Sequence, residues 1–381
     1  MSTSRPVLRI IPELRADHVK RSQNLTSAET LYLETNADLE GTGVPDEFRR
    51  VTLLGLLRSV ILTRATTLEL PEPLWVRFLP KTMLAALAWK ASRLVRWVPG
   101  STVAYAIENN EPGNLLFGDR SVPKSFVRPS VLILGICIRM SVDRLCFGSE
   151  GSRATYQSIP LVNGIDHSVV VNLPARPNCT SESTQGEKTR RNRVSFVGVL
   201  EHRKGIDVLM RSWPSVEQRC PDAVLTIVGD GPMRREVEQW SAERPRSRNF
   251  RGRLPHSQVS NVVGGSALLV APSVRAGRWR EQIGLPMLEA LTVGATVVTS
   301  DETALATWLA AQGHSVIPAY ELSRGLAGVI VDRLREPLPP DKVIASLPEV
   351  SGRVVADRWM NRSQHTNNDC STENQSRNGN C

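Results

Sequence analysis

The second half of the chain alternates short apolar runs with amphipathic segments in a regular order. The apolar runs span residues 194–200, 223–231, 267–273 and 294–300, and helix-like segments at 207–217 and 233–242 follow the first two. Continuous apolar runs are typical of strands buried on both faces, and intervening helices favour a parallel sheet. We therefore expect a doubly wound domain ending near residue 335, with ligands bound beyond the carboxyl ends of its strands.

The first half is less regular. Apolar runs at residues 7–11, 30–35, 48–54, 59–66 and 102–109 are strand candidates, and residues 144–160 read as a strand followed by a helix capped near Ser149. Helix-like segments intervene, so an open and mostly parallel sheet is expected here too.

One helix of the first half, residues 80–98, has two distinct faces. Its apolar face comprises Met83, Leu84, Leu87, Ala88, Ala91, Leu94, Val95 and Val98. Its other face carries Trp89, Lys90, Arg93, Arg96 and Trp97. Basic side chains beside tryptophan suit the boundary of an anionic membrane, where indole rings lie at headgroup level. The alternative is a helix that packs on the core and has a basic polar face.

The most informative stretch is residues 278–294. It places seven residues between Glu281 and Glu289, with Gly284 in the gap and Pro286 in the first turn of a predicted helix. Backbone N–H groups near Gly284 and Leu285 favour an anion at the helix start. A phosphate flanked by two carboxylates that accept hydroxyl hydrogen bonds is typical of a nucleotide-sugar site. Ordinary solvated glutamates are the alternative.

A second polar group follows the predicted strand that ends at Gly198. Arg203, Lys204 and Gly205 lie in the loop before the next helix. Adjacent arginine and lysine side chains can neutralise a diphosphate and stabilise the charge that develops as it leaves. An Arg-Lys pair is also common on surfaces, and its place at a strand's carboxyl end favours the functional interpretation.

Length, charge and cysteine content add three expectations. A chain of 381 residues is expected to form two domains, and its net charge of +9 favours an anionic partner: nucleic acid, nucleotide phosphates or a membrane surface. No apolar run is long enough to span a membrane, and the first residues do not resemble a secretory signal. Six cysteines without paired spacing indicate neither a zinc site nor a disulfide framework, and favour the cytoplasm.

Together, residues 198–209, 229–232, 252, 272–273 and 281–291 resemble the donor domain of glycosyltransferase family 4. The resemblance extends over residues 194–335, and residues 141–150 are similar to a late strand of that family's N-terminal domain. It implies an α/β chain of the GT-B fold, with two facing Rossmann-like domains and a cleft between them. The expected division is an acceptor-binding domain at 1–175, a linker at 176–193, a donor domain at 194–346, a helix crossing back at 347–360 and a disordered tail at 361–381.

The resemblance also implies an activity. Family members are retaining hexosyltransferases that use no metal or cofactor and move a sugar from a nucleotide diphosphate to a glycan or lipid-linked acceptor. This chain would then act in cell-envelope or polysaccharide synthesis, in the cytoplasm or peripherally at the inner face of the membrane. The implied catalytic residues are Arg203, Lys204 and Glu281, and the implied donor-binding residues are Gly198, Gly252, Arg253, Leu254, Gly284, Leu285 and Glu289.

The implied roles differ by residue. Glu289 would bind the ribose hydroxyls and Glu281 the hydroxyls of the donor sugar. Gly284 and Leu285 would offer backbone N–H groups to the phosphates, Arg203 and Lys204 would hold the diphosphate, and residues 252–254 would lie against the base.

The chain departs from the family pattern at three places. Val199 stands where arginine often follows the first donor-domain strand, and no glycine-rich loop follows Ile11. Glu108 stands near the position where a histidine often follows a strand, which makes it a candidate contact to the reacting sugar. Alternatives are a sugar-nucleotide epimerase, which shares the architecture, and a catalytically impaired homologue that only binds nucleotide sugar. Nucleic-acid binding has no motif to support it.

Overall fold

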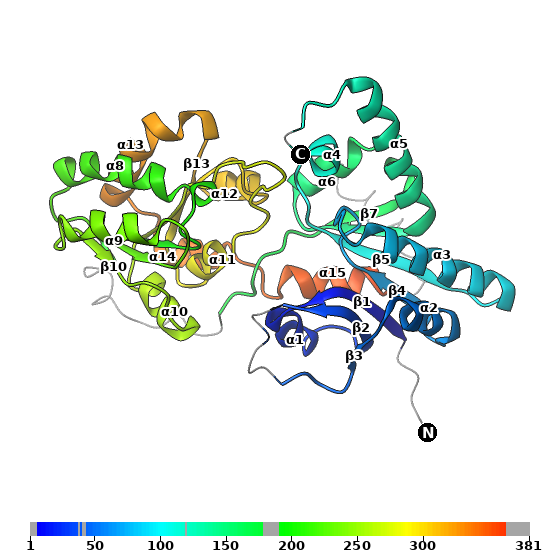
Figure 1. Cartoon of the computed structure of the whole chain (residues 1–381). Coiled ribbons are helices and arrows are strands. Elements are labelled where there is room, and N and C mark those ends of the chain that lie inside the picture. The colour runs from blue at the N-terminus through cyan, green and yellow to red at the C-terminus, as the bar shows by residue number, and fades with distance from the viewer. Residues whose placement is uncertain (1–5, 37–38, 40–42, 119, 178–189, 363–381) are drawn as a thin grey trace, which may run out of the picture.

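A computed structural model describes residues 6–36, 39, 43–118, 120–177 and 190–362 of the chain. Within these residues the strands form two parallel sheets, each flanked by helices (Figure 1). The remaining residues include most of the predicted linker and all but the first two residues of the predicted tail, which therefore lie outside the described part of the chain.

The first sheet has the strand order β3-β2-β1-β4-β5-β6-β7 among the described residues, with every pair parallel. Its strands are β1 Val7–Leu14, β2 Ala28–Thr35, β3 Phe48–Arg50, β4 Thr67–Leu70, β5 Ser101–Ala106, β6 Arg144–Phe147 and β7 Asp166–Val169. Its helices are α1 Ala16–Ser22, α2 Leu53–Leu62, α3 Leu79–Arg96, α4 Pro112–Phe117, α5 Lys124–Ser141 and α6 Glu150–Gln157.

Two predicted strands of the first half were wrong in part. Residues 53–62 form helix α2, although we expected extended chain over 48–54 and 59–66. The Thr52 hydroxyl caps this helix by accepting the N–H of Gly55 at 3.2 Å, and Leu56 and Val60, four residues apart, are fully buried. The apolar run is therefore buried along a helical stripe. The predicted Ser149 cap of α6 is confirmed, because its side chain accepts the N–H of Ser152.

The second sheet has the order β10-β9-β8-β11-β12-β13 over residues 190–362. Its strands are β8 Arg193–Val197, β9 Val224–Val228, β10 Arg248–Phe250, β11 Leu268–Ala271, β12 Thr296–Ser300 and β13 Ser315–Ile317. Its helices are α8 Ile206–Arg219, α9 Arg234–Ala242, α10 His256–Gly264, α11 Leu285–Thr292, α12 Ala306–Ala311, α13 Leu322–Arg335 and α14 Pro340–Ala345. The predicted alternation of strands and helices in this half is confirmed.

Helix α15, Gly352–Met360, packs on β5 and β6 of the first sheet (Figure 1). A buried ion network attaches it. Arg9 of β1 contacts Glu69 of β4 at 2.6 Å and Asp357 of α15 at 3.1 Å, and Arg353 of α15 contacts Glu69 at 2.5 Å. Burial disfavours ionisation of Glu69, but the two guanidinium groups outweigh it and hold the pKa of this carboxyl below its usual range.

Helix α3 corrects the prediction about its two faces. Trp89 and Arg93, which we placed on an exposed face that could contact a membrane, are buried. The Arg93 guanidinium carbon lies 4.0 Å from the centroid of the Trp89 ring, and Arg93 donates to the Thr63 carbonyl at 2.7 Å. Lys90 pairs with Asp143 at 2.7 Å, so of the five predicted membrane residues only Arg96 and Trp97 are exposed.

The apolar face of α3 is correspondingly the outer one. Leu94 and Val95 are 75% and 78% exposed, whereas the small residues Ala85 and Ala86 are buried. Helix α3 packs beside α2 and α5, and small side chains allow that close approach. Helical periodicity identified two faces correctly but assigned the wrong one to the interior. No helix of the described ranges is both long and apolar enough to cross a membrane.

Candidate active site

The predicted site residues converge where the strand order of the second sheet reverses. The chain runs outward from β8 to β9 and β10, then returns to β11 and runs outward on the other side to β12 and β13. Strands β8 and β11 are therefore neighbours, and the loops after them share one edge of the sheet. Open α/β sheets bind ligands in the crevice at such a switch point.

Lys204 and Glu281 meet at this edge, although they are 77 positions apart in the sequence. The Lys204 ammonium lies 2.5 Å from Oε2 of Glu281, and the same oxygen accepts the Ser273 hydroxyl at 3.0 Å. Glu281 and Ser273 are buried, while Lys204 keeps a fifth of its side chain exposed. The geometry gives a buried carboxylate held by one cation and one hydroxyl.

Trp279 is a site residue that sequence reasoning missed. The Arg203 guanidinium carbon lies 4.3 Å from its ring centroid, and the Lys204 ammonium lies 4.8 Å from it. Arg203 also forms an ion pair with Glu201. A cation held over an aromatic face is restricted in position. The signal in the sequence was a lone tryptophan two residues before Glu281, inside the loop already singled out.

Two glycines make the local backbone possible. Gly205 has a φ of 72°, and a Cβ there would lie 1.9 Å from the Pro272 carbonyl oxygen. Gly284, with a φ of 65°, is the N-cap of α11, and a Cβ there would lie 2.4 Å from the end of the Met287 side chain. A residue with a Cβ atom would be strained at either position, both by the positive φ and by the close contact. The predicted start of α11, with Pro286 in its first turn, is confirmed.

Glu289 lies in α11 and is half-buried. Its Oε1 atom is 3.6 Å from Nδ1 of His256, while its Oε2 atom is buried and has no hydrogen-bond partner among the described residues. Burial raises the pKa of this carboxyl. A buried polar atom without a partner is costly, and a ligand hydroxyl would satisfy it.

The other predicted donor residues lie on the loops at the same edge. The Gly198 N–H donates to the Val228 carbonyl at 3.0 Å, and the Gly229 N–H donates to the Gly252 carbonyl at 2.9 Å. These bonds hold the loops after β8, β9 and β10 together. Arg253 and Leu285 are exposed, and Leu254 is half-buried. The structure thus brings together the predicted loops, while the contact of each residue with a donor stays a prediction.

A set of hydrogen bonds, which we term the interdomain clasp, joins residues 108–110 to the loop before α11. Asn109 and Asn110 donate through their amide groups to the carbonyls of Glu281 and Arg278, at 3.1 and 2.9 Å. The Gln282 amide donates to Glu108 Oε2 at 2.9 Å. The clasp therefore positions the Glu281 loop from the side of the first sheet.

A second carboxylate, that of Glu72, holds the backbone at Glu108. Its Oε1 atom accepts the N–H groups of Asn109 and Asn110, and burial raises its pKa. Glu72 accepts the N–H groups of Ile107 and Glu108 at 2.6 and 3.0 Å, and burial raises the pKa of Glu72 to about 7. Both carboxylate oxygens of Glu108 thus bond to protein groups, and its contact with the reacting sugar stays a prediction.

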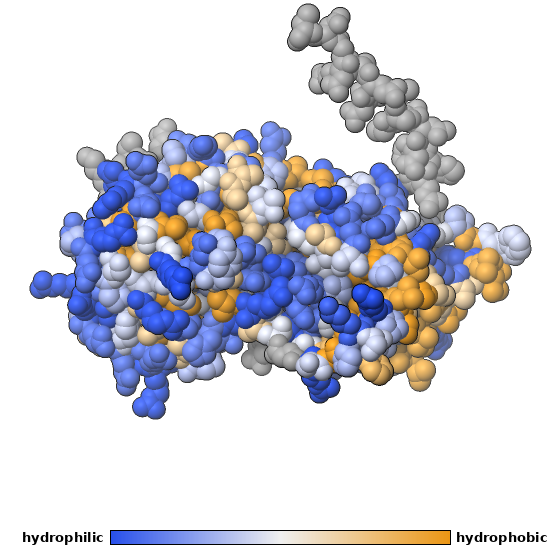
Figure 2. Space-filling view, turned by 90° about the horizontal axis from the view of Figure 1, so that it is seen from above, coloured by the Kyte–Doolittle hydropathy of each residue, from blue (hydrophilic) through white to orange (hydrophobic). Residues whose placement is uncertain are grey.

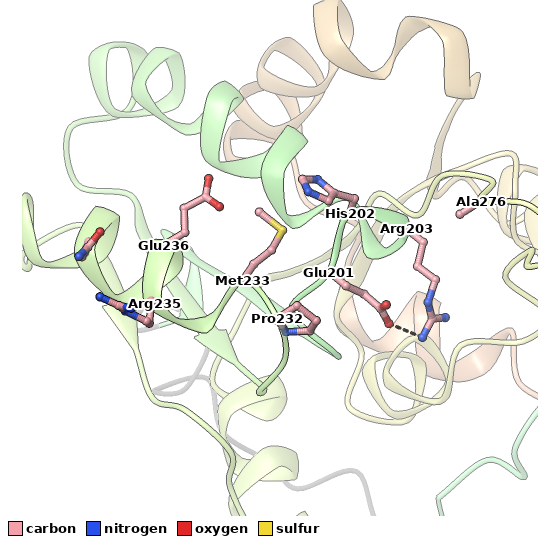
Figure 3. Close-up of a pocket in the computed structure, with 9 residues that line it drawn as sticks. Glu201, His202, Arg203, Pro232, Met233, Arg235, Glu236 and Ala276 are labelled. Atoms are coloured by element: carbon pink, nitrogen blue, oxygen red, sulfur yellow. Dashed lines mark ion pairs between the residues drawn. The ribbon is translucent and has the colours of Figure 1, made fainter.

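A pocket of about 770 Å³ lies next to Arg203 (Figure 3). The 3₁₀ turn His202–Lys204 borders one side and the start of α9 the other. Its lining comprises Glu201, His202, Arg203, Pro232, Met233, Arg235, Glu236, Gln239 and Ala276. In Figure 3 Glu201 and Arg203 point toward each other. Arg203 belongs both to this pocket and to the predicted site, whereas Glu281 and Glu289 do not line the pocket. Over the described ranges, no three His, Cys, Asp or Glu side chains are placed to hold a metal ion.

Comparison with solved structures gives the class of fold. The chain superposes on the lipopolysaccharide outer core galactosyltransferase WaaB with a TM-score of 0.64 and 12% identity, over 93% of this chain and 97% of that one. It therefore has the two-sheet GT-B fold, as expected from the sequence.

Comparison with protein families gives a match to the part of the chain that forms the second sheet. Residues 180–330 match the model described as "Glycosyl transferases group 1", so this segment is a group 1 glycosyltransferase domain, and the suspected resemblance is confirmed.

Two curated relatives match similar lengths of the chain. One is the GDP-mannose-dependent monoacylated alpha-(1-6)-phosphatidylinositol monomannoside mannosyltransferase of Corynebacterium glutamicum, 28% identical over 182 residues, which are 45% of this chain and 47% of that protein. The other is the 2-deoxystreptamine N-acetyl-D-glucosaminyltransferase of Streptomyces fradiae, 28% identical over 185 residues, covering 45% and 41%. The chain thus matches less than half the length of each relative.

Proposed function

We propose that this protein is a retaining, metal-independent hexosyltransferase that moves a sugar from a nucleotide diphosphate to a glycan or lipid-linked acceptor. The observation that carries the proposal is the cluster at the switch point. There Glu281, whose carboxylate pairs with Lys204, lies in the loop before α11, and α11 carries Glu289, whose Oε2 atom has no hydrogen-bond partner in the part of the chain that the structure describes. A diphosphate sugar needs cations for its phosphates and acceptors for its hydroxyls.

The roles of the residues follow from this chemistry. Lys204 and Arg203 hold the diphosphate and stabilise its charge as the bond to the sugar breaks. Glu289 accepts ribose hydroxyls, and Glu281 accepts hydroxyls of the donor sugar. The start of α11, at Gly284 and Leu285, offers backbone N–H groups to phosphate. Holding the reacting groups in one geometry supplies much of the rate.

The acceptor binds the first domain, at the side of the clasp that faces the donor loops. The names of the relatives include both a phosphatidylinositol mannoside and 2-deoxystreptamine, so they support either a lipid-linked or a soluble acceptor. We favour a lipid-linked acceptor in cell-envelope or polysaccharide synthesis, with the protein peripheral at the inner face of the membrane. The reason is that the outer surface of α2, α3 and α5 exposes apolar and basic side chains.

A thermal-shift screen tests the donor site. Purified protein is heated with UDP, GDP, ADP and their sugar conjugates, without added metal. We expect one nucleoside diphosphate to raise the melting temperature, since a ligand of the folded state stabilises it by mass action. The shift should be lost in Glu289→Ala and kept in Glu238→Ala, a matched control at an exposed glutamate of α9.

Product analysis separates the alternatives. Release of free nucleoside diphosphate with a glycosylated acceptor supports the transferase. A converted sugar nucleotide would indicate an epimerase, and binding without any product over a range of acceptors would indicate a binding-only homologue. No shift with any nucleotide would refute the donor site itself.

A further inference from the structure

Three neighbouring helices of the first domain expose an unusual number of apolar side chains. We name the outer surface of α2, α3 and α5 the three-helix face; α3 packs between the other two. Its most exposed apolar residues include Leu54 of α2, Leu94 and Val95 of α3, Trp97 just after α3, and Phe126 and Ile133 of α5. All are more than 60% exposed. Contiguous apolar surface of this kind marks an interaction site.

Figure 2 shows where this surface lies. Apolar residues gather at the end of the molecule that carries α2, α3 and α5 in Figure 1, while the second sheet occupies the opposite end. The site at the carboxyl edge of the second sheet is therefore separate from the three-helix face. A partner could cover this face without covering the Glu281 cluster.

The charge of the three helices identifies the partner. Helix α2 has one basic residue, α3 has four and α5 has three, and none of the three contains Asp or Glu, although 38 of the chain's 381 residues are acidic. Arg58, Arg96, Arg128 and Arg139 are exposed and form no ion pair within the described residues. Apolar side chains edged by unpaired arginines require a partner that is apolar and anionic.

We propose that the three-helix face docks on the interface of an anionic lipid bilayer. Leucine, valine and phenylalanine side chains enter the boundary between headgroups and acyl chains, and the arginines bind lipid phosphates. Trp97, 92% exposed at the end of α3, lies at headgroup level. The biological role of this docking rests on the proposed function, because a lipid-linked acceptor would lie in the membrane. The observations that support docking come from α2, α3 and α5 alone.

A second copy of this chain fits the face less well. Two such faces brought together would oppose arginines to arginines with no carboxylate from any of the helices between them. Like charges in contact are strongly unfavourable. A bilayer supplies the missing negative charge as well as the apolar phase, and self-association therefore becomes an outcome of the test.

The test measures binding of the full chain to vesicles by flotation. One vesicle type is phosphatidylcholine alone, and the other is phosphatidylcholine mixed with phosphatidylglycerol. We expect binding to the anionic vesicles that weakens as salt is added, because surface charges are screened. The double substitution Leu94→Glu, Val95→Glu should reduce binding about tenfold or more, since it places two carboxylates in the docking surface.

Tyr320→Glu provides the matched control. It also adds a carboxylate at an exposed large side chain, 82% exposed, but in the part of the chain around the second sheet. This variant should bind vesicles as the unaltered protein does. Both substitutions are at exposed positions, and the melting temperature of each variant verifies that it folds.

Three outcomes would overturn the proposal: no binding of the unaltered protein to anionic vesicles, equal binding by the Leu94, Val95 variant, or equal losses in that variant and in Tyr320→Glu. A dimer in solution that the Leu94, Val95 variant dissociates, without vesicle binding, would assign the face to self-association. The nucleotide thermal shift on the same samples separates the two claims. Loss of vesicle binding with a retained shift leaves the donor site standing, and the reverse leaves the docking face standing.

Discussion

The buried ion network that attaches α15 to the first sheet allows a sharp prediction about stability. Glu69 is the centre of the network, because its two oxygens contact Arg9 at 2.6 Å and Arg353 at 2.5 Å. The Glu69, Arg9 and Arg353 side chains are 6%, 7% and 14% exposed. Glu69→Gln keeps the shape and removes one negative charge, so Asp357 alone would have to balance two guanidinium groups.

The cost follows from the burial. Removing one partner of a buried ion pair typically destabilises a protein by about 3–5 kcal/mol, because the remaining charge is buried without compensation. For a folding unit of 150–250 residues, each kcal/mol lowers the melting temperature by about 2–4 °C, so a fall of roughly 6–20 °C is expected for the transition of the first domain. Scanning calorimetry of the full chain measures it.

Glu29→Gln is the matched control. Glu29 contacts Arg49 at 2.8 Å, a similar distance, but the two side chains are 42% and 54% exposed. Exposed pairs contribute about 0–1 kcal/mol, so this variant should melt within a few degrees of the unaltered protein. Equal shifts in the two variants would refute the reasoning, since the substitution is the same and burial is the main difference.

The pH dependence gives a second check with a definite sign. The pKa of Glu69 is lower in the folded protein than its ordinary value of 4.5. Its ionised form therefore contributes stability that is fully present above pH 4.5 and is lost as pH falls below that value through the folded pKa. The difference in melting temperature between the unaltered protein and Glu69→Gln should be constant near neutral pH and shrink below 4.5. A difference that grows on acidification would contradict the assignment.

The remaining predictions concern the site. Lys204→Ala should lower kcat about 10²–10³-fold, the usual loss when one group that stabilises developing charge is removed, with Lys204→Arg retaining more activity; unchanged kinetics would exclude Lys204 from the reaction. Asn110→Ala removes the clasp bond to Arg278 and the bond from the Glu111 N–H, each worth about 1 kcal/mol, and should lower kcat/KM by up to about tenfold; the melting temperature checks that the variant folds, and an unaffected kcat/KM would remove the clasp from catalysis. Gly284→Ala should weaken the nucleotide shift, because alanine disfavours the backbone conformation there, and a full shift would show that this loop tolerates distortion.

Local pattern was sufficient for most of the second half of the chain. The apolar runs predicted as strands at residues 194–200, 223–231, 267–273 and 294–300 coincide with β8, β9, β11 and β12, because strands buried on both faces leave a distinct pattern. The predicted helices coincide with α8, α9 and α11, whereas α10 was not predicted. Gly205 and Gly284 were singled out in the sequence by their places in the two polar loops, and the structure shows that both have a positive φ, which glycine adopts readily. The amino-acid sequence by itself therefore locates the loop of Glu281 and the start of α11.

Which residues meet, and which face of a helix is buried, depends on packing between segments that are far apart in the chain. Lys204 contacts Glu281, and Trp279 contacts both Arg203 and Lys204, because β8 and β11 are neighbours, and no spacing along the chain encodes that pairing. Helix α3 has one apolar face and one with tryptophan and arginine, and periodicity cannot say which side its neighbours cover. Packing beside α2 and α5 buried Trp89 and Arg93 and left Leu94 and Val95 outside, since burial depends on what lies against a helix as well as on its own sequence.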